Sequence, residues 1–363
     1  MSQTDFNCEG IESNKVQTEL IKCSSCGSNM IFDPDLQCLF CVHCNSKVLF
    51  DNDEIANEQD ITSLGFNKDN VWSKDETSIF RCDNCGASVV LQKNETATSC
   101  PFCGTAHVTK VEELEGLKPN ALIPFSFGDD KAIEITKEWA RKKLFAPRKF
   151  KKNIKTDNVK GVYAPCFTFD SSTTSIYVGR IGKRYTRVVG SGKNRRVESY
   201  IVWRNISGTY YNQFDDILIT AGSKLGQKQI DKLSPYDTNA SKKFNQNYML
   251  GFMAYHYDSE LSECWSQAKD RIDSVLKQKI LSQYFYDVVD YIKISTTHEH
   301  VTYKYVMLPV YVGNFIYNKK PYNFYVNGNT GKVCGKTPKS IFKILLTCFL
   351  CVAAVVGITL LAL

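Results

Sequence analysis

The chain has 363 residues and a net charge of +7; 43% of its residues are hydrophobic and 23% are charged. This length and composition fit two or three globular domains and exclude a wholly disordered, collagen-like or coiled-coil protein. The charge is uneven, because residues 1–116 carry 8 basic and 19 acidic residues, whereas residues 117–363 carry 37 and 19. The resulting net charges of −11 and +18 indicate two parts of the chain with different partners.

The N-terminal segment, residues 1–20, is polar and predicts a flexible N-terminus. It has neither the basic nor the apolar stretch of a secretory signal peptide, so we expect the chain to stay in a reducing compartment. Fifteen cysteines in such a compartment favour metal binding over disulfides, and ten of them precede residue 104.

Two groups of four cysteines have the same spacing. They are Cys23, Cys26, Cys41 and Cys44 and, 59 positions later, Cys82, Cys85, Cys100 and Cys103. Each group has two C-x2-C pairs with 14 residues between them, which is typical of a zinc ribbon with a tetrahedral four-thiolate site. We therefore predict two zinc ions, one in a first ribbon at residues 21–50 and one in a second ribbon at residues 79–110. An acidic linker at residues 51–78 joins the ribbons.

Alternatives exist for the metal and for its ligands. Iron is the chemical alternative to zinc, and a redox dithiol is disfavoured because no βαβ pattern surrounds the C-x2-C pairs. Cys38 and His43 lie within the first ribbon, but neither recurs 59 residues later, so we expect neither to bind metal. After the second cysteine of each pair we expect a left-handed backbone. These positions hold Gly27, Asn45, Gly86 and Gly104.

Residues 117–340 predict a strand-dominated α+β body. Helices are expected at 129–144 and 259–282, where apolar residues follow helical spacing. Aromatic and β-branched runs separated by turn residues predict strands. These runs are 162–170, 174–178, 185–189, 197–203, 206–211, 217–221, 288–295, 301–317 with a break near Pro309, and 322–327. Residues 190–194 are expected to form the tip of a hairpin.

A basic cluster surrounds this hairpin tip. Its members are Arg180, Lys183, Arg184, Arg187, Lys193, Arg195 and Arg196. No acidic residue lies among them, which favours contact with anionic lipid headgroups or with nucleic acid. A solvated hairpin is the alternative, and a membrane-held body would favour lipid over nucleic acid.

The last 20 residues, 344–363, contain no charged side chain. A helix of that length spans about 30 Å, which is the thickness of the hydrocarbon core of a bilayer. We therefore predict a single transmembrane helix at residues 341–363, acting as a tail anchor, in preference to a buried core helix. Lysines and no acids precede it, so the positive-inside rule predicts a single-pass protein of the cell membrane with its N-terminal body in the cytoplasm.

Enzyme motifs are incomplete. Residues 335–337 read Gly-Lys-Thr, but Thr330 replaces the first glycine that a phosphate-binding loop needs. His298 and His300 flank a glutamate, and no third metal ligand is indicated. We therefore expect no catalytic function.

Short motifs of the body follow the two ribbons in order. They are LKP at 117–119, IPF at 123–125, GVYAPCF at 161–167, LSPYD at 233–237, LPVY at 308–311 and NGNTGKV at 327–333. Together they resemble the bacterial TFIIB-type zinc-ribbon membrane protein family, some of whose members are encoded beside homologues of phage-shock protein A. Asn45 and Phe167 depart from the usual Gly and Trp of that family, and neither is a zinc ligand. The resemblance implies a membrane-docked scaffold of the envelope stress response with phage-shock protein A-like partners.

The function expected from these features is that of a membrane-anchored zinc-ribbon adaptor that recruits protein partners to the cytoplasmic face of the membrane. The acidic charge of residues 1–116 would repel a phosphate backbone, so the ribbons are expected to be folding units or protein-docking modules. The alternative is a membrane-tethered nucleic-acid-binding protein associated with transcription or replication. Such a protein would use the basic hairpin.

Overall fold

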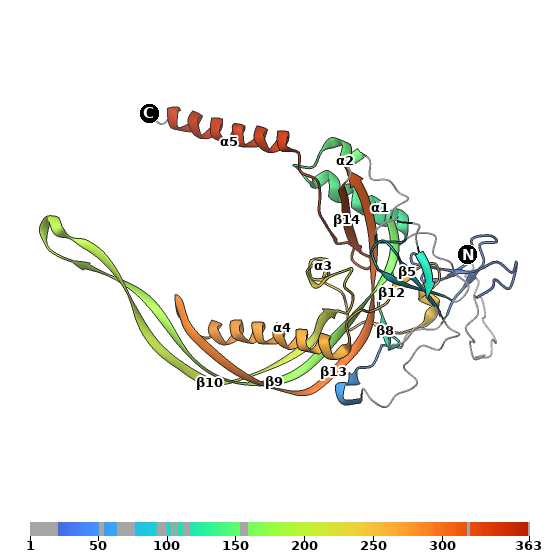
Figure 1. Ribbon diagram of the computed structural model, residues 1–363, viewed down its shortest axis with the longest axis horizontal. Helices are drawn as coiled ribbons and strands as arrows, with labels where there is room; N and C mark the ends of the chain where they lie inside the picture. The colour runs from blue at the N-terminus through green and yellow to red at the C-terminus, as the bar shows by residue number, and fades with distance from the viewer. Residues whose placement is uncertain are drawn as a thin grey trace, which may run out of the picture.

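The computed structural model describes residues 21–50, 54–63, 77–92, 100–102, 105, 108–111, 117–152, 159–317 and 320–361. Within these residues a long curved sheet carries helices, and the cysteine-rich modules lie at one end of it (Figure 1). The predicted strand-dominated α+β class is confirmed. The predicted flexible segment 1–20 and Cys103 lie outside the described residues.

Three long strands form the curved sheet. β9 (Val159–Val189) lies in the middle and pairs antiparallel with β10 (Arg196–Thr220) on one side and β13 (Val288–Tyr317) on the other. A 3-10 turn, η4 (Gly192–Asn194), joins β9 to β10 and makes them one hairpin. Gly190 precedes this turn with φ of 93°, a conformation that favours glycine. The predicted hairpin tip is therefore confirmed.

Two β-bulges bend this sheet at the same level. β10 shifts register at residues 214–217 and β13 at residues 299–302, on the two sides of Asp170 in β9. Asp216 and His300 take left-handed backbone angles within the bulges, with φ of 50° and 51°. Bulges add local twist and turn a strand, so two of them side by side account for the bend visible in Figure 1.

Helix α4 (Leu261–Ser282) lies along the concave face of the sheet (Figure 1). Its buried side chains recur every three or four residues, as expected for one apolar face. They include Leu261, Cys264, Ala268, Ile272, Leu276 and Ile280. Trp265 contacts Phe169 of β9, with ring centroids 5.3 Å apart. On the outer half of the strands, Ile176 of β9 is 62% exposed.

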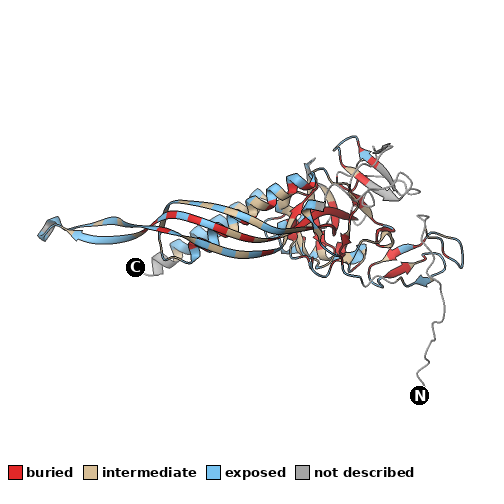
Figure 2. Cartoon of the chain, turned by 90° about the horizontal axis from the view of Figure 1, so that it is seen from below, coloured by how far each residue is buried: buried red, intermediate tan, exposed pale blue. Residues whose placement is uncertain are grey.

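The main core lies where the sheet approaches the cysteine-rich modules, and Figure 2 shows the buried residues gathered there. Four buried rings contact one another: Phe125, Tyr163, Phe252 and Tyr311. Several short elements surround this core. They are β8 (Ala121–Leu122), α1 (Asp129–Lys142), α2 (Arg148–Lys152), α3 (Gln227–Leu233), β11 (Lys242–Lys243), η5 (Gln246–Met249), β14 (Lys320–Asn327) and β15 (Val333–Gly335).

The two cysteine-rich modules attach to the body in different ways. The first has a separate sheet of β1 (Ile31–Asp33), β2 (Cys38–Phe40) and β3 (Lys47–Val48). The second contributes strands to the main twelve-stranded sheet. These are β5 (Thr77–Cys82), β6 (Ser88–Gln92) and β7 (Val108–Val111). The link is β12 (Met253–Tyr255), which pairs with β6 and lies parallel to β9. Between the modules, β4 (Gln59–Asp60) pairs with β13 and leads into η1 (Ile61–Ser63).

Helix α5 (Ile341–Leu361) occupies the segment in which we predicted a transmembrane helix. Lys343 lies in its first turn, and no acidic residue does. Among the described residues, no helix is both long enough and apolar enough for a membrane crossing. This finding contradicts the predicted transmembrane anchor and, with it, the predicted single-pass location in the cell membrane.

Candidate metal centres

The first ribbon brings its four cysteines together. All four sulfur atoms of Cys23, Cys26, Cys41 and Cys44 lie within 4.8 Å of one another. The Sγ atoms of Cys23 and Cys44 are 3.4 Å apart, and those of Cys26 and Cys41 are 3.5 Å apart. A tetrahedral zinc with Zn–S bonds of about 2.3 Å would separate its sulfurs by roughly 3.8 Å. The group could therefore hold a zinc ion after a small expansion.

Tight backbone turns point both pairs of cysteines inward. The amide of Gly27 donates to the carbonyl of Cys23 at 2.8 Å, and the amide of Asn45 donates to the carbonyl of Cys41 at 2.9 Å. Gly27 and Asn45 have φ of 73° and 60°, so the predicted left-handed positions are confirmed in the first ribbon. Asn tolerates this conformation better than most residues, which explains how Asn45 replaces glycine.

The thiols of the first ribbon differ in acidity. Backbone hydrogen bonds, above all from Ser25, lower the pKa of Cys23 to about 6. Hydrogen bonds from Ser28 lower the pKa of Cys26. Burial instead raises the pKa of Cys38, which is not in the group of four. Backbone hydrogen bonds from Cys44 and His43 act to lower the pKa of Cys41, but burial and the thiols of Cys26 and Cys44 outweigh them and raise it to about 11. Metals bind the thiolate form, so the acidity favours Cys23 and Cys26 as ligands. Position, and not acidity, separates Cys41 from Cys38.

The second ribbon shows three of its four predicted ligands. Cys82, Cys85 and Cys100 form a second group, with Sγ of Cys85 and Cys100 3.7 Å apart. Gly86 repeats the turn of the first ribbon. Its φ is 70°, and its amide donates a hydrogen bond to the carbonyl of Cys82. The fourth predicted ligand, Cys103, lies outside the described residues. Three converging cysteines could likewise bind zinc.

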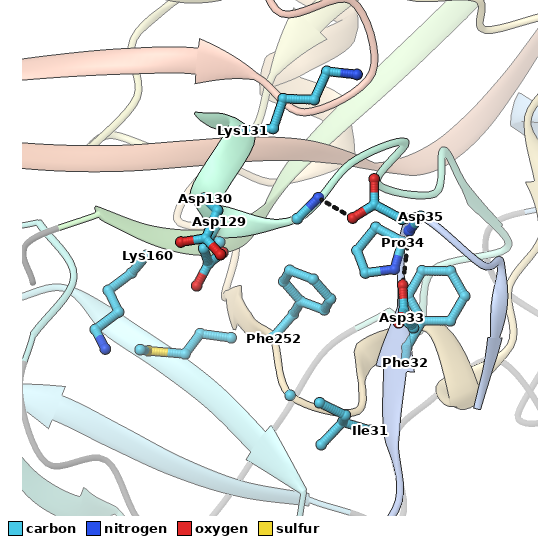
Figure 3. A pocket seen from close by; sticks show the side chains of 14 residues that line it. Ile31, Phe32, Asp33, Pro34, Asp35, Asp129, Asp130, Lys131, Lys160 and Phe252 are labelled. Carbon is cyan, nitrogen blue, oxygen red and sulfur yellow. Dashed lines mark hydrogen bonds between the residues drawn. The ribbon is translucent and has the colours of Figure 1, made fainter. Parts of the chain in front are cut away.

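A cavity of about 520 Å³ lies between the first ribbon and the start of α1 (Figure 3). Phe32 and Phe252 form its apolar wall. Its acidic rim consists of Asp33, Asp35, Asp129 and Asp130. The amide of Gly128 donates to Asp35 at 3.3 Å, which ties the ribbon to the helix terminus. Lys131 and Lys160 also line the cavity, so its carboxylates outnumber its ammonium groups by four to two. This excess of negative charge beside an apolar wall suits a side chain with an apolar stem and a positive end.

A buried charge cluster lies at the bend of the sheet, and sequence reasoning missed it. Lys304 is 5% exposed, and its Nζ lies 3.1 Å from Asp216 and 3.5 Å from Glu58. The amide of Asp216 donates to Asp170 at 2.7 Å. Carboxylates of Glu58, Asp170 and Asp215 also converge within 4.8 Å. The cluster fastens the segment between the ribbons to β9, β10 and β13, with Lys304 offsetting part of its negative charge.

This cluster predicts a pH-dependent stability. Burial, with the hydrogen bond to Glu58, raises the pKa of Asp170 to about 7, whereas an unfolded aspartate titrates near 4. Between these two pKa values the folded protein holds a proton that the unfolded chain has released. The free energy of unfolding therefore falls as pH rises from about 4 to 7. We expect Asp170→Asn to flatten the pH dependence of the free energy of unfolding in this window. The stability that the variant gains over the unsubstituted protein should be larger at pH 8 than at pH 5.

Urea unfolding of both proteins at pH 5 and pH 8 measures this effect. The difference between the two proteins is the readout, because thiolates of the ribbons titrate in the same range in both. If the Asp170→Asn variant gains nothing at pH 8 relative to pH 5, Asp170 is ionised at neutral pH in the folded state.

The predicted basic residues lie far from the cysteines, along the β9–β10 hairpin (Figure 1). Arg180, Lys183, Arg184 and Arg187 belong to β9, and Arg196 begins β10. Arg195 follows the turn, and the backbone of Lys193 lies within it. The structure therefore gathers these positions on one hairpin and separates them from both metal centres.

Comparison with known proteins gives one informative match. No family model matches the chain, and no solved structure matches it. The uncharacterized protein YdjG of Bacillus subtilis (strain 168) is 29% identical over 329 residues, which cover 89% of this chain and 91% of that protein. A match of this length includes ribbon sequence as well as the body, so the similarity extends across both parts.

Proposed function

We propose that the protein is a zinc-ribbon adaptor that recruits protein partners and has no catalytic role. The observation that carries this proposal is the convergence of Cys23, Cys26, Cys41 and Cys44 at distances that suit one metal ion. A module of about 30 residues buries too little apolar surface to fold alone, and a structural zinc supplies the missing stability. The metal then holds a surface in shape, and does not act on a substrate.

The docking surface in this proposal is the acidic cavity beside the first ribbon. It joins ribbon and body, so its shape depends on the metal. Its acidic rim suits a basic side chain of a partner, and Phe252 suits the apolar stem of that side chain. By family resemblance, the proposed partner is a phage-shock protein A-like protein, and the proposed setting is the envelope stress response of TFIIB-type zinc-ribbon proteins.

Titration calorimetry of the full chain with a purified phage-shock protein A homologue tests the proposal. We expect binding that is lost after chelation and restored by zinc. Replacing Asp129 and Asp130 with asparagine should weaken binding at least tenfold without loss of zinc, because the cavity loses half of its acidic rim. Replacing Asp231 and Asp270, which do not line the cavity, with asparagine removes the same charge and should leave the affinity unchanged. Equal binding by the zinc-free protein and the zinc-loaded protein would refute the proposal.

A further inference from the structure

The hairpin of β9 and β10 extends beyond the rest of the sheet. The last pairing of β13 with β9 is Val288 with Gly182, whereas β10 follows β9 as far as Val189. Residues 183–202 therefore form a two-stranded arm, beside which no third strand lies among the described residues, as Figure 1 shows at its left. A lone two-stranded ribbon is marginally stable in water, so an arm of this length is expected to gain stability from a bound partner.

The arm is strongly basic. It has six basic residues and one acidic residue, a net charge of +5. Its acid, Glu198, lies between Arg187 at 3.4 Å and Arg196 at 2.8 Å, and both arginine side chains remain largely exposed, at 65% and 74%. The described parts of the acidic ribbons lie at the opposite end of the molecule (Figures 1 and 2). Salt screens charges beyond roughly 8 Å, so the ribbons do not cancel the field of the arm.

The paired cations of the arm lie on both of its faces, three on one face and Arg184 on the other. Residues that pair across a hairpin share a face, and successive residues alternate between faces. One face therefore carries the pairs Lys183–Val202, Tyr185–Tyr200, Arg187–Glu198 and Val189–Arg196. The other carries Arg184–Ile201, Thr186–Ser199 and Val188–Val197. A flat anionic surface would meet one face only, whereas a groove with phosphates on both walls would meet both.

Aromatic contacts stiffen the arm. Tyr185 and Tyr200 stack with ring centroids 5.9 Å apart, and the guanidinium of Arg187 lies 5.6 Å from the Tyr200 ring. At the base of the arm, Trp203 and Ile201 lie over Gly182, where a Cβ would come within 2.5 Å of Ile201. These contacts hold Arg187 and the two strands in place before a partner arrives, which lowers the entropy cost of binding.

We propose that this arm binds duplex DNA by entering its major groove. Two strands about 4.8 Å apart, with their side chains, fill a groove that is about 12 Å wide and admits a two-stranded ribbon. Seven residue pairs give the arm a length of roughly 23 Å, enough to cross the groove. Arginines on both faces reach the phosphates of both walls, and those contacts are largely independent of sequence. This activity goes beyond the proposed recruitment of proteins, and it uses the opposite end of the molecule.

Fluorescence anisotropy of a labelled 30-base-pair duplex with the full chain tests the proposal. Non-ionic detergent covers the exposed apolar residues of α5 in every sample. We expect the affinity to fall with salt, with a log–log slope of about −4 to −5 if five phosphates are contacted. Replacing Arg184, Arg187, Arg195 and Arg196 with glutamine should weaken binding at least about 50-fold at 0.1 M salt and reduce the slope by about 3 to 4.

A matched control removes four charges elsewhere. Arg141, Lys142, Arg148 and Lys149 lie on α1 and α2, and their replacement by glutamine should change the affinity less than threefold. Glu198→Gln should instead tighten binding, because it releases Arg187 and Arg196. Zinc content and thermal unfolding confirm that all variants are folded. Equal losses in the two glutamine variants would overturn the proposal. It would also be overturned if phosphatidylglycerol vesicles or polyglutamate, at equal charge, outcompeted the duplex, because the arm would then be a lipid or acidic-protein site.

Discussion

Replacing Cys41 with serine is expected to lower the zinc content from two ions per chain to one and to unfold the first ribbon. Cys41 is fully buried, and its sulfur lies 3.5 Å from that of Cys26. In zinc-finger peptides a structural zinc contributes about 10–16 kcal/mol, far more than the small apolar core of such a module. Plasma emission spectrometry measures the zinc, and limited proteolysis reports whether residues 21–50 have become cleavable.

Cys38 provides the control for this experiment. It is buried in the same ribbon, at 2% exposed, but it is not in the group of four sulfurs. Cys38→Ser should therefore keep two zinc ions and cost about 1–3 kcal/mol through the buried hydroxyl. Loss of an ion in the Cys38→Ser variant, or its retention in the Cys41→Ser variant, would show that we have assigned the ligands wrongly.

Replacing Phe125 with alanine is expected to destabilise the body by about 3–5 kcal/mol. Phe125 is fully buried and stacks on Phe252 at a centroid distance of 4.3 Å, with Tyr163 and Tyr311 at 5.0 and 4.8 Å. Its removal leaves a cavity among three rings that cannot close together without moving β9 and β13. Urea unfolding followed by tryptophan fluorescence measures the change in the free energy of unfolding.

An exposed phenylalanine gives the matched comparison. Phe285 is 77% exposed and contacts the ammonium of Lys183 at 3.7 Å from the ring centroid. Phe285→Ala removes the same atoms and should cost less than about 1 kcal/mol, because little apolar surface is lost from the interior. If both variants lost the same stability, the four-ring cluster would not be the centre of the core.

The helices could be predicted closely from the sequence. The expected helix at 129–144 is α1 (Asp129–Lys142), and the expected helix at 259–282 is α4 (Leu261–Ser282). The predicted helix ends were less accurate, because α1 ends at Lys142. Leu144 lies beyond this end and is 77% exposed. Helical spacing reveals the buried face, but it says little about where the last turn ends.

The strands were predicted as many short segments, whereas β9, β10 and β13 are continuous. Polar residues such as those at 171–175 look like breaks in a sequence, yet they continue β9 through its bend. Pro309 also lies inside β13, where its carbonyl accepts a hydrogen bond from Gly328, although we expected a break there. Bulges and partner strands decide such continuity, and both are set by residues far away in the chain.

The cysteines of the metal centres could be predicted because ligand spacing is local. The cluster of Glu58, Asp170, Asp216 and Lys304 could not, because these residues come from four distant segments. The available signal was a lysine in the middle of an apolar run, Lys304 between Tyr303 and Tyr305. Such a residue must find a buried counter-ion, but the sequence does not say which one.

By pairing with β12, strand β6 of the second ribbon covers a strand edge at which another chain could otherwise pair. While the ribbon is folded, β6 occupies one edge of β12 through Val90 and Val89, and β9 occupies the other. If metal loss unfolded the second ribbon, β12 would present a bare row of amides and carbonyls beside an apolar interior, which is a template for strand addition from another chain. Loss of metal from the first ribbon, whose sheet is separate, exposes no such edge. Zinc starvation should therefore lead to aggregation through the second site, whereas at the first site it should open the ribbon and remove the proposed docking surface.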